Sequence, residues 1–460
     1  MEETAIDIAE QVRAGRRSAT EVLEACLAEV AAGNEALNAF VHIDEGLARE
    51  AAAAVDAAVT EGRDPGPFAG VPIGVKDLED CAGMPTSHGS LVYKGSAPVA
   101  ADSVHLARLR AAGAVPIGKT AAPEFGTLNF TKTRAWGITR NPWDPSRTPG
   151  GSSGGTAAAV AAGLIPCGTA SDGGGSTRIP AGFSGLVGMK PSHGRIPHPG
   201  PTGSQTAVSG LLTTTVADSA RHLDVTAGPD DRDRLSLPAP TVRYEDAIET
   251  LDVGALRARW SLDLGFVEDV DPEVAEIARA AAEKLVAAAA LAGDDGEVRL
   301  SDPVRAWLGM GAMDLWFGIE EDMWPAVADD LTRYSRGVLE QTEAYPVSKF
   351  ARAVRAREQL TLDAAALFAE VDVLLTPTTA VPAFAAEGPP PGGAMATPFT
   401  MLANLCWNPS ISVPAGLTSE GLPVGLQITA ARHRDEVPLR LARIWEQTSP
   451  WPRHAPRVAA

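Results

Sequence analysis

Cysteine is scarce in this sequence, and its distribution excludes two kinds of cross-linked fold. Four cysteines occur in 460 residues, at Cys26, Cys81, Cys167 and Cys406. They lie far apart and form no CxxC pair, so neither a disulfide framework nor a zinc ribbon is predicted. Reduced thiols, as in a cytoplasmic protein, are the expected state. With 45% hydrophobic residues, the chain can bury a large core without such cross-links.

The sequence also has fewer basic than acidic residues and few long apolar runs. The 39 Lys and Arg are outnumbered by 58 Asp and Glu, which gives a net charge of −19, and no run of basic residues occurs. An acidic surface disfavours phosphate backbones, so no nucleic-acid partner is expected. The longest apolar stretches are rich in alanine and are broken by Pro166 or Gly293, so no membrane span is expected. The acidic N-terminus does not resemble a signal peptide, and we expect a cytoplasmic location.

Helical and strand-like segments are mixed along the whole chain. Apolar residues at helical spacing predict helices over residues 5–14, 19–32, 47–60, 103–112, 155–162 and 271–292, and a mostly helical stretch over 302–370. Short apolar runs predict strands or short segments near residues 68–77, 115–118, 187–190, 213–217, 371–375, 411–413 and 424–428. This mixture favours an α/β fold with helices on both faces of a sheet.

Two loops rich in glycine and serine carry the central signal. The first serine loop spans residues 149–156 (PGGSSGGT), and the second serine loop spans residues 171–178 (SDGGGSTR). Glycine lets the backbone turn sharply or approach another group closely. Three glycines before Ser176 leave a run of backbone N–H groups that can hold the oxygen of a tetrahedral intermediate. Either loop alone is also compatible with a flexible turn or a phosphate cradle.

The base that would activate such a serine is predicted to be Lys76. A serine hydroxyl is a weak nucleophile until a base removes its proton. Histidine is the usual base, but none of the eight histidines lies in either serine loop, and only His193 follows closely. Lysine can serve when burial keeps it neutral, and Lys76 lies at the end of the apolar segment 68–77. A structural lysine paired with Asp77 or Glu79 is the alternative.

One further segment matches a nucleotide-binding pattern in the wrong context. Residues 113–120 (GAVPIGKT) fit the GxxxxGK[ST] expression. A predicted helix precedes this segment and a strand-like run lies inside it, whereas a phosphate-binding loop follows a strand and opens a helix. Pro116 also removes an N–H group that a phosphate cradle would use. We therefore expect no nucleotide site here.

Several other motifs surround the serine loops in a fixed order. They are residues 70–77 (GVPIGVKD), 118–120 (GKT), 123–125 (PEF), 141–143 (NPW), 185–191 (GLVGMKP), 412–416 (SVPAG) and 421–427 (GLPVGLQ). Together with the two serine loops, these motifs resemble the amidase signature enzymes over nearly the whole chain. The resemblance implies a single α/β/α domain over residues 1–460, built around a mixed sheet.

We expect a signature core at about 66–225 and a helical substrate-pocket region at about 271–370. The polar, proline-rich composition predicts a connector at about 226–246, and strand-like runs predict C-terminal strands at about 371–430. The resemblance also implies a triad. By position, Lys76 is the base, Ser152 the middle serine and Ser176 the nucleophile of a Ser–cis-Ser–Lys triad. A hydroxyl both donates and accepts, so Ser152 can pass the proton of Ser176 to Lys76.

The second serine loop is also expected to form the oxyanion hole. The resemblance implies that the N–H groups of Gly173, Gly174, Gly175 and Ser176 stabilise the oxyanion while Ser176 becomes acylated. No metal or organic cofactor is expected.

Four further polar residues are expected to support the site. Ser153 and Ser171 are candidates for orienting Ser152 and Lys76. Asp172 and Arg178 are expected to brace the second serine loop, although a surface salt bridge is the alternative for Arg178.

The chain departs from the usual family pattern at four positions. Gly173 stands where the family often has Thr, Thr156 where it often has Ser, Ser184 where it often has Cys, and His193 where it often has Tyr. None of these positions belongs to the triad.

The substrate pocket is expected to be apolar. Large side chains occur in the predicted helical region and after it, at Trp307, Met310, Met313, Trp316, Phe317, Trp324, Cys406 and Trp407. Most of them are expected to be core residues, and Trp316, Cys406 and Trp407 are the candidates for the pocket. Such a pocket favours an aryl or alkyl amide, linear or cyclic, over a charged one. Residues 137–143 loosely resemble the corresponding stretch of 6-aminohexanoate cyclic dimer hydrolase.

The predicted function is therefore amide hydrolysis through a seryl acyl-enzyme, with a small-molecule amide as the partner. The alternative is the A subunit of a tRNA-dependent amidotransferase, which shares these motifs and acts inside a complex. A scaffold protein with an inactive site is a third interpretation, disfavoured because all three triad residues are present. The sequence leaves open whether the protein forms a homodimer.

Overall fold

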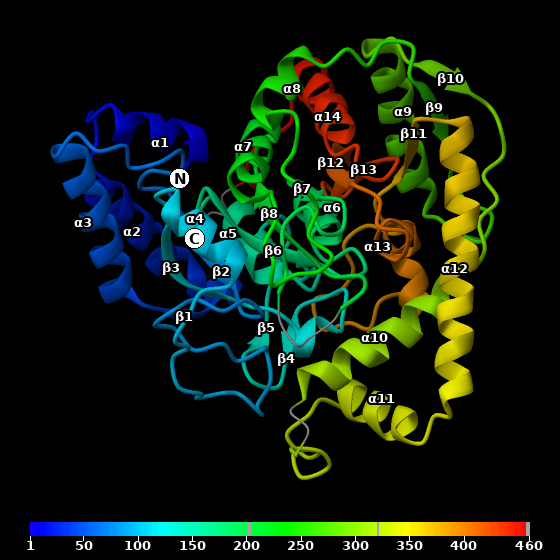
Figure 1. The fold of residues 1–460 in the computed structure, drawn as a ribbon, viewed down its shortest axis with the longest axis horizontal. Helices are drawn as coiled ribbons and strands as arrows, with labels where there is room; N and C mark the ends of the chain where they lie inside the picture. Colours follow the sequence, from blue (N-terminus) through cyan, green and yellow to red (C-terminus); the bar gives the residue numbers. More distant parts are fainter. Residues whose placement is uncertain (200–203, 320–321, 457–460) are drawn as a thin grey trace.

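The centre of the molecule is an 11-stranded mixed sheet, seen in the computed structural model, which describes residues 1–199, 204–319 and 322–456 (Figure 1). Its strands lie side by side in the order β1-β3-β2-β6-β8-β7-β12-β13-β11-β9-β10, and β4 and β5 form a separate pair. The strands are β1 (Phe40–Ile43), β2 (Pro72–Lys76), β3 (Val115–Thr120), β4 (Lys132–Thr133), β5 (Gly137–Ile138), β6 (Cys167–Asp172), β7 (Val187–Lys190), β8 (Val208–Thr213), β9 (Arg257–Trp260), β10 (Ala292–Asp294), β11 (Val373–Pro377), β12 (Ser410–Leu417) and β13 (Pro423–Ala430).

Helices surround this sheet. Figure 1 shows α1–α3 at one end of the molecule and α10–α12 at the opposite end. The helices are α1 (Ala5–Arg13), α2 (Ala19–Leu37), α3 (Glu45–Thr60), α4 (Val104–Ala111), α5 (Gly154–Ala161), α6 (Arg178–Ser184), α7 (Val216–Thr226), α8 (Tyr244–Thr250), α9 (Pro272–Ala288), α10 (Val304–Gly318), α11 (Arg333–Glu343), α12 (Val347–Glu370), α13 (Met401–Leu405) and α14 (Glu436–Thr448), with 3₁₀ turns η1 (Glu124–Gly126), η2 (Gly393–Ala396) and η3 (Pro398–Thr400).

Local sequence explains where the helices begin. Thr4 and Ser18 form capping boxes with Asp7 and Glu21 at the starts of α1 and α2. Asp271 accepts hydrogen bonds from the first turn of α9, and Pro272 occupies the first helical position, where its missing N–H has no consequence.

The small residues of α5 allow this helix to lie within the core. All eight of its residues are buried, and they pack near β2, β6 and α2. A Cβ at Gly155 would collide with the backbone of Ala121 and Ala39. The sequence GGTAAAVA therefore allows close packing of a helix that begins directly after Ser153.

Strand order brings the predicted site residues to one edge of the sheet. β2 and β6 are parallel neighbours, with Ile73 opposite Cys167. The carboxyl ends of parallel strands meet at the same edge, which is where ligands usually bind in α/β sheets. Lys76 is the last residue of β2, and Asp172 is the last residue of β6 and belongs to the second serine loop. Lys76 therefore lies beside the second serine loop.

The predicted fold class, a mixed sheet covered by helices, is confirmed. The expected connector lies between α7 and α8, and the division of the chain into domains remains a prediction. Over the described ranges, no helix combines the length and apolarity needed to cross a bilayer.

Candidate active site

Lys76 is buried, and the hydroxyl groups of Ser152 and Ser171 surround its amine. Its side chain is 1% exposed. Nζ lies 2.8 Å from Ser152 Oγ, 2.9 Å from Ser171 Oγ and 3.3 Å from the Ser171 carbonyl oxygen. Burial lowers the pKa of Lys76 to about 7, although the carboxylates of Asp172 and Glu79 oppose this shift. A lysine in this environment is neutral in a large fraction of molecules near neutral pH.

Ser152 lies between this amine and the second serine loop. Its side chain is 2% exposed, and the Gly151–Ser152 peptide bond is cis, as the family resemblance implied. The N–H of Ser153 donates to the Ser176 carbonyl at 3.3 Å, which holds the two serine loops side by side. Ser153 Oγ lies 3.4 Å from both the carbonyl oxygen and the N–H of Ser171.

Ser176 differs from Ser152 and Ser153 in its accessibility. Its side chain is partly exposed, as are Gly173 and Gly174. Within the described part of the chain, the Ser176 hydroxyl makes no hydrogen bond, and only the carbonyl of this residue is bonded, to Ser153. A substrate can therefore reach this hydroxyl without first breaking a protein contact.

The N–H groups of the second serine loop are not equivalent. Gly175 N–H donates to Asp172 Oδ1 at 2.7 Å. The N–H groups of Gly173, Gly174 and Ser176 have no acceptor among the described residues. Gly175 has φ +126°, and a Cβ there would collide with Thr400. Three of the four predicted oxyanion donors are thus free, and the fourth is engaged in holding the loop.

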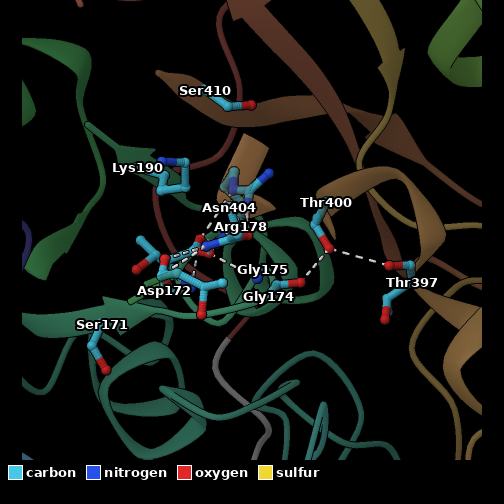
Figure 2. Close-up of polar contacts among 12 residues, drawn as sticks. Ser171, Asp172, Gly174, Gly175, Arg178, Lys190, Thr397, Thr400, Asn404 and Ser410 are labelled. Carbon is cyan, nitrogen blue, oxygen red and sulfur yellow. Dashed lines mark hydrogen bonds and ion pairs between the residues drawn. The ribbon is translucent and has the colours of Figure 1, made fainter. Parts of the chain in front are cut away.

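Asp172 and Arg178 form a fully buried ion pair beneath this loop (Figure 2). The guanidinium donates to the carboxylate through Nε at 3.0 Å and through Nη2 at 2.9 Å. Burial alone would raise the pKa of Asp172, but Arg178 holds it well below its ordinary value. The surface alternative considered for Arg178 is therefore wrong, because both side chains are 0% exposed.

Residues from the C-terminal part of the chain complete this brace, and they were not predicted as site residues. Arg178 also donates to Asn404 Oδ1 at 2.6 Å and to Gln427 Oε1 at 2.8 Å. Asn404 Nδ2 donates to the Asp172 carbonyl at 2.7 Å, and Thr400 Oγ1 donates to the Gly174 carbonyl at 2.6 Å (Figure 2).

Two of these supporting residues gave little signal in the sequence. Asn404 and Thr400 lie in ordinary helical context far from the serine loops. Gln427 lies in one of the motifs that accompany the serine loops, but no role followed from it.

A second lysine, Lys190, lies close to the Asp172–Arg178 pair (Figure 2). Burial, followed by the neighbouring Arg178 guanidinium, lowers the pKa of Lys190 to about 7. The Nζ atom of Lys190 donates to the Pro191 carbonyl at 2.8 Å. Among the described residues, this amine makes no hydrogen bond with either triad serine, which separates Lys190 from Lys76.

The three candidates for the pocket lie in different surroundings. Trp316 donates to Thr342 at 2.8 Å and packs against Trp324, so its ring lies in the packing between α10 and α11. Cys406 lines a separate cavity of about 390 Å³ beside α12, which contains no triad residue. Trp407 stacks on His193 with ring centroids 4.6 Å apart.

Another indole, that of Trp307 in α10, contacts the second serine loop directly. A Cβ at Gly174 would collide with its Nε1. Trp307 was among the large side chains noted in the sequence but was not among the three pocket candidates. The direction of a helical side chain depends on how the helix packs, which the sequence did not show.

The positions that depart from the family pattern have structural partners. Thr156 Oγ1 lies 2.6 Å from Thr120 Oγ1, and Ser184 Oγ donates to the Pro149 carbonyl at 3.2 Å. His193 stacks on Trp407, and burial lowers the pKa of His193 to about 3. A Cβ at Gly173 would meet only ordinary contacts at 3.9 Å, so there is room for a Cβ at this position.

Over the described ranges, no group of three or more His, Cys, Asp or Glu side chains is arranged to hold a metal ion.

Comparison with known proteins shows to which family this site belongs. The family model for amidases matches residues 21–306 and 313–439. This chain belongs to the amidase signature family. Amidase signature enzymes of this kind are hydrolases that act on carbon–nitrogen bonds, and this chain is such a hydrolase.

Its relatives within the amidase signature family are named for two different activities, that of an amidotransferase subunit and that of an acylamidase. The chain is 36% identical to the A subunit of the Glutamyl-tRNA(Gln) amidotransferase of Synechococcus sp. (strain RCC307), over 95% of this chain and 96% of that protein. It is 35% identical to an acylamidase of Rhodococcus erythropolis, over 97% and 96%. The solved structure of a bacterial aryl acylamidase of the amidase signature family matches with a TM-score of 0.92 and 28% identity, over 98% of this chain and 97% of that one.

Proposed function

We propose that this protein is an amidase that acts without a partner subunit on small or medium-sized apolar or aryl amides, linear or cyclic. The observation that carries the proposal is the position of Lys76 Nζ, 2.8 Å from Ser152 Oγ, in an environment that lowers the pKa of the amine to about 7. A buried amine of this kind is a suitable general base at neutral pH.

In the proposed first half-reaction, Ser176 Oγ attacks the amide carbon. The proton of Ser176 passes to Ser152 Oγ while the proton of Ser152 passes to Lys76 Nζ. The N–H groups of Gly173, Gly174 and Ser176 stabilise the oxyanion. The ammonium of Lys76 then returns a proton through Ser152 to the leaving nitrogen, the carbon–nitrogen bond breaks, and an ester forms on Ser176.

In the proposed second half-reaction, water attacks the ester by the same relay. A proton of the water passes through Ser152 to Lys76 and is returned to Ser176 Oγ as the carboxylic acid leaves. Ser171 and Ser153 hold Lys76 and the first serine loop in register, through the hydrogen bonds described above.

Support for an apolar substrate comes from Trp307, whose indole borders Gly174. A site bordered by an indole ring favours apolar ligands.

The second candidate function is that of the A subunit of an amidotransferase, which is favoured by the relative at 36% identity. Sequence identity does not distinguish the two candidate functions, because the acylamidase is 35% identical to this chain and the amidotransferase subunit 36%. Purified protein that releases ammonia from glutamine and ignores aryl amides would favour this second candidate.

The experiment that tests the proposal is hydrolysis of a panel of para-nitroanilides and simple aryl amides by the purified protein. Mass spectrometry would locate the trapped acyl group. We expect the acyl group on Ser176, and we expect Ser176→Ala to lose at least about 10⁴-fold in kcat while remaining folded. The matched control is Ser96→Ala, on an exposed loop, which should retain full activity. Full activity of Ser176→Ala would exclude the proposed nucleophile.

A further inference from the structure

One face of α10 lies along the second serine loop. Trp307 borders Gly174, and Asp314 follows it by seven residues. Residues seven positions apart lie on the same face of a helix, two turns along. Asp314 is therefore carried by the same face of α10 that meets the loop through Trp307.

The contacts of Asp314 place its carboxylate beside the loop. Asp314 Oδ2 accepts from Ser204 Oγ at 2.9 Å and from Thr206 Oγ1 at 3.5 Å. Thr206 Oγ1 in turn lies 3.9 Å from the position of a Cβ on Gly173. Asn404 donates to the Thr206 carbonyl at 3.2 Å and fixes this segment to the brace of the loop.

Asp314 differs from Asp172, the other carboxylate next to this loop, in its partners. Asp172 is paired with the Arg178 guanidinium. Among the described residues, Asp314 has two hydroxyl donors and no cation within ion-pair distance. Its side chain is partly exposed, so a ligand can reach it, yet burial raises the pKa of Asp314 to about 6. A carboxylate of this kind gains more from a cationic partner than one already paired.

We propose that Asp314 is a specificity-determining residue that selects amides carrying an ammonium group a few bonds from the scissile carbonyl. This inference rests on the proposed function, since it assigns the substrate class of the same site. The apolar part of the substrate lies against Trp307, and its ammonium group donates to the Asp314 carboxylate. Within the proposed class of amides, the preferred substrates are then those whose apolar acyl chain ends in an ammonium group.

The first test compares matched substrates with the wild-type protein. A short series of ω-amino acyl para-nitroanilides is paired with the corresponding unsubstituted acyl para-nitroanilides, which differ by the ammonium group alone. We expect kcat/KM to be about 10- to 100-fold higher for the ammonium member of at least one pair, the range for a hydrogen bond to a charged group. Equal values in every pair, or higher values for the neutral members, overturn the inference.

The second test uses Asp314→Asn, which keeps the shape and removes the charge. We expect the ammonium preference to fall by about 10-fold or more, while kcat/KM for the neutral substrates changes by less than about twofold. Asp295→Asn, an exposed residue, is the charge-matched control and should keep the preference. Equal losses on both substrate classes would show a structural role and overturn the inference.

The two proposals fail in distinguishable ways. If the protein hydrolyses neutral amides through Ser176 without any ammonium preference, the proposed function stands and the role of Asp314 is excluded. If no amide of either class is hydrolysed and no acyl group is trapped on Ser176, the proposed function fails and the inference fails with it. Should Asp314→Asn not fold, the wild-type comparison alone decides.

Discussion

The segment that carries the serine loops and the region formed by α10–α12 differ in how their side chains meet solvent. Between residues 149 and 184, every residue is buried except Ala162, Ser171, Gly173, Gly174 and Ser176, which are partly exposed. In α10–α12, by contrast, Leu308, Phe317, Val347 and Leu362 are between 45% and 83% exposed. The two serine loops are thus held by a densely packed scaffold, and the side chains of α10–α12 are less constrained.

The charged groups of the two regions differ in the same way. Arg178 is fully buried and bonds to residues of β6, α13 and β13. Arg336 of α11 pairs with Glu340, one turn away, and both side chains are about half exposed. Breaking the first interaction leaves an uncompensated buried charge, whereas solvent replaces the second. The geometry of the second serine loop therefore depends on long-range contacts.

The largest expected effect is on stability when the buried pair is broken. Asp172→Asn should lower the free energy of unfolding by about 3–5 kcal/mol, because it leaves Arg178 buried without a counter-ion. The same substitution in α12, Asp363→Asn, should cost about 1 kcal/mol, because Asp363 accepts hydrogen bonds from Ser301 and is partly exposed. Chemical denaturation of both variants measures the difference, and equal losses would remove the proposed contrast.

The next effect is on catalysis when a side chain is added to the loop. Gly175→Ala should lower kcat by about 10²-fold, because a Cβ there collides with Thr400 and φ is +126°. The control is Gly311→Ala in α10, where nothing lies within 4 Å of the new Cβ. That variant should retain activity and gain about 0.5–1 kcal/mol of stability. Steady-state kinetics and thermal melts separate the two outcomes.

A smaller effect is expected from pH. Because burial lowers the pKa of Lys76 to about 7, the amine is neutral above this pH and protonated below it. The rate of acylation should therefore rise with pH, falling about tenfold per unit below pH 7 and levelling off above it. Single-turnover burst kinetics at several pH values measure this rate.

Lys190 provides the control for the pH profile, since its pKa is also lowered to about 7. Lys190→Met should keep the inflection if Lys76 is the base. Loss of the inflection in that variant would assign it to Lys190, and a flat profile down to mildly acidic pH would count against a neutral lysine altogether.

The smallest effect is expected on the exposed face of α10. Leu308 is 51% exposed, so Leu308→Ala should change the free energy of unfolding by no more than about 0.5 kcal/mol. Light scattering on the same samples reports the oligomeric state. A larger loss of stability, or a change in mass, would show that this face is covered in solution and would break the comparison between the two regions.

The residues of the predicted triad could be singled out from local signals together with the family resemblance, and their catalytic roles stay a prediction. The glycines that shape each serine loop are adjacent to the serine concerned, and Lys76 ends an apolar strand. Helix positions such as α1 and α2 followed from periodicity in the same way. α14 was not predicted, although Val437, Leu441 and Trp445 recur at helical spacing and are buried.

Residues that act across the fold could not be predicted in this way. Asn404 is 232 residues from Asp172 in the sequence, and no motif around Asn404 indicates that the two residues are in contact. Trp316 was expected in the pocket, but helix packing turns it toward Thr342. Asp314 could have been noticed in the sequence, because it is an acidic residue between the apolar Met313 and Leu315. Its partners Ser204 and Thr206 come from another segment and could not have been predicted.

The hydrogen bonds of Arg178 have a consequence for biosynthesis. Gln427, one of its partners, is 249 residues further along the chain. At roughly 5–20 residues per second, the ribosome needs about 12–50 s to reach it after adding Arg178. The second serine loop therefore emerges without its full brace, and hydrolytic activity should appear only when synthesis is nearly complete.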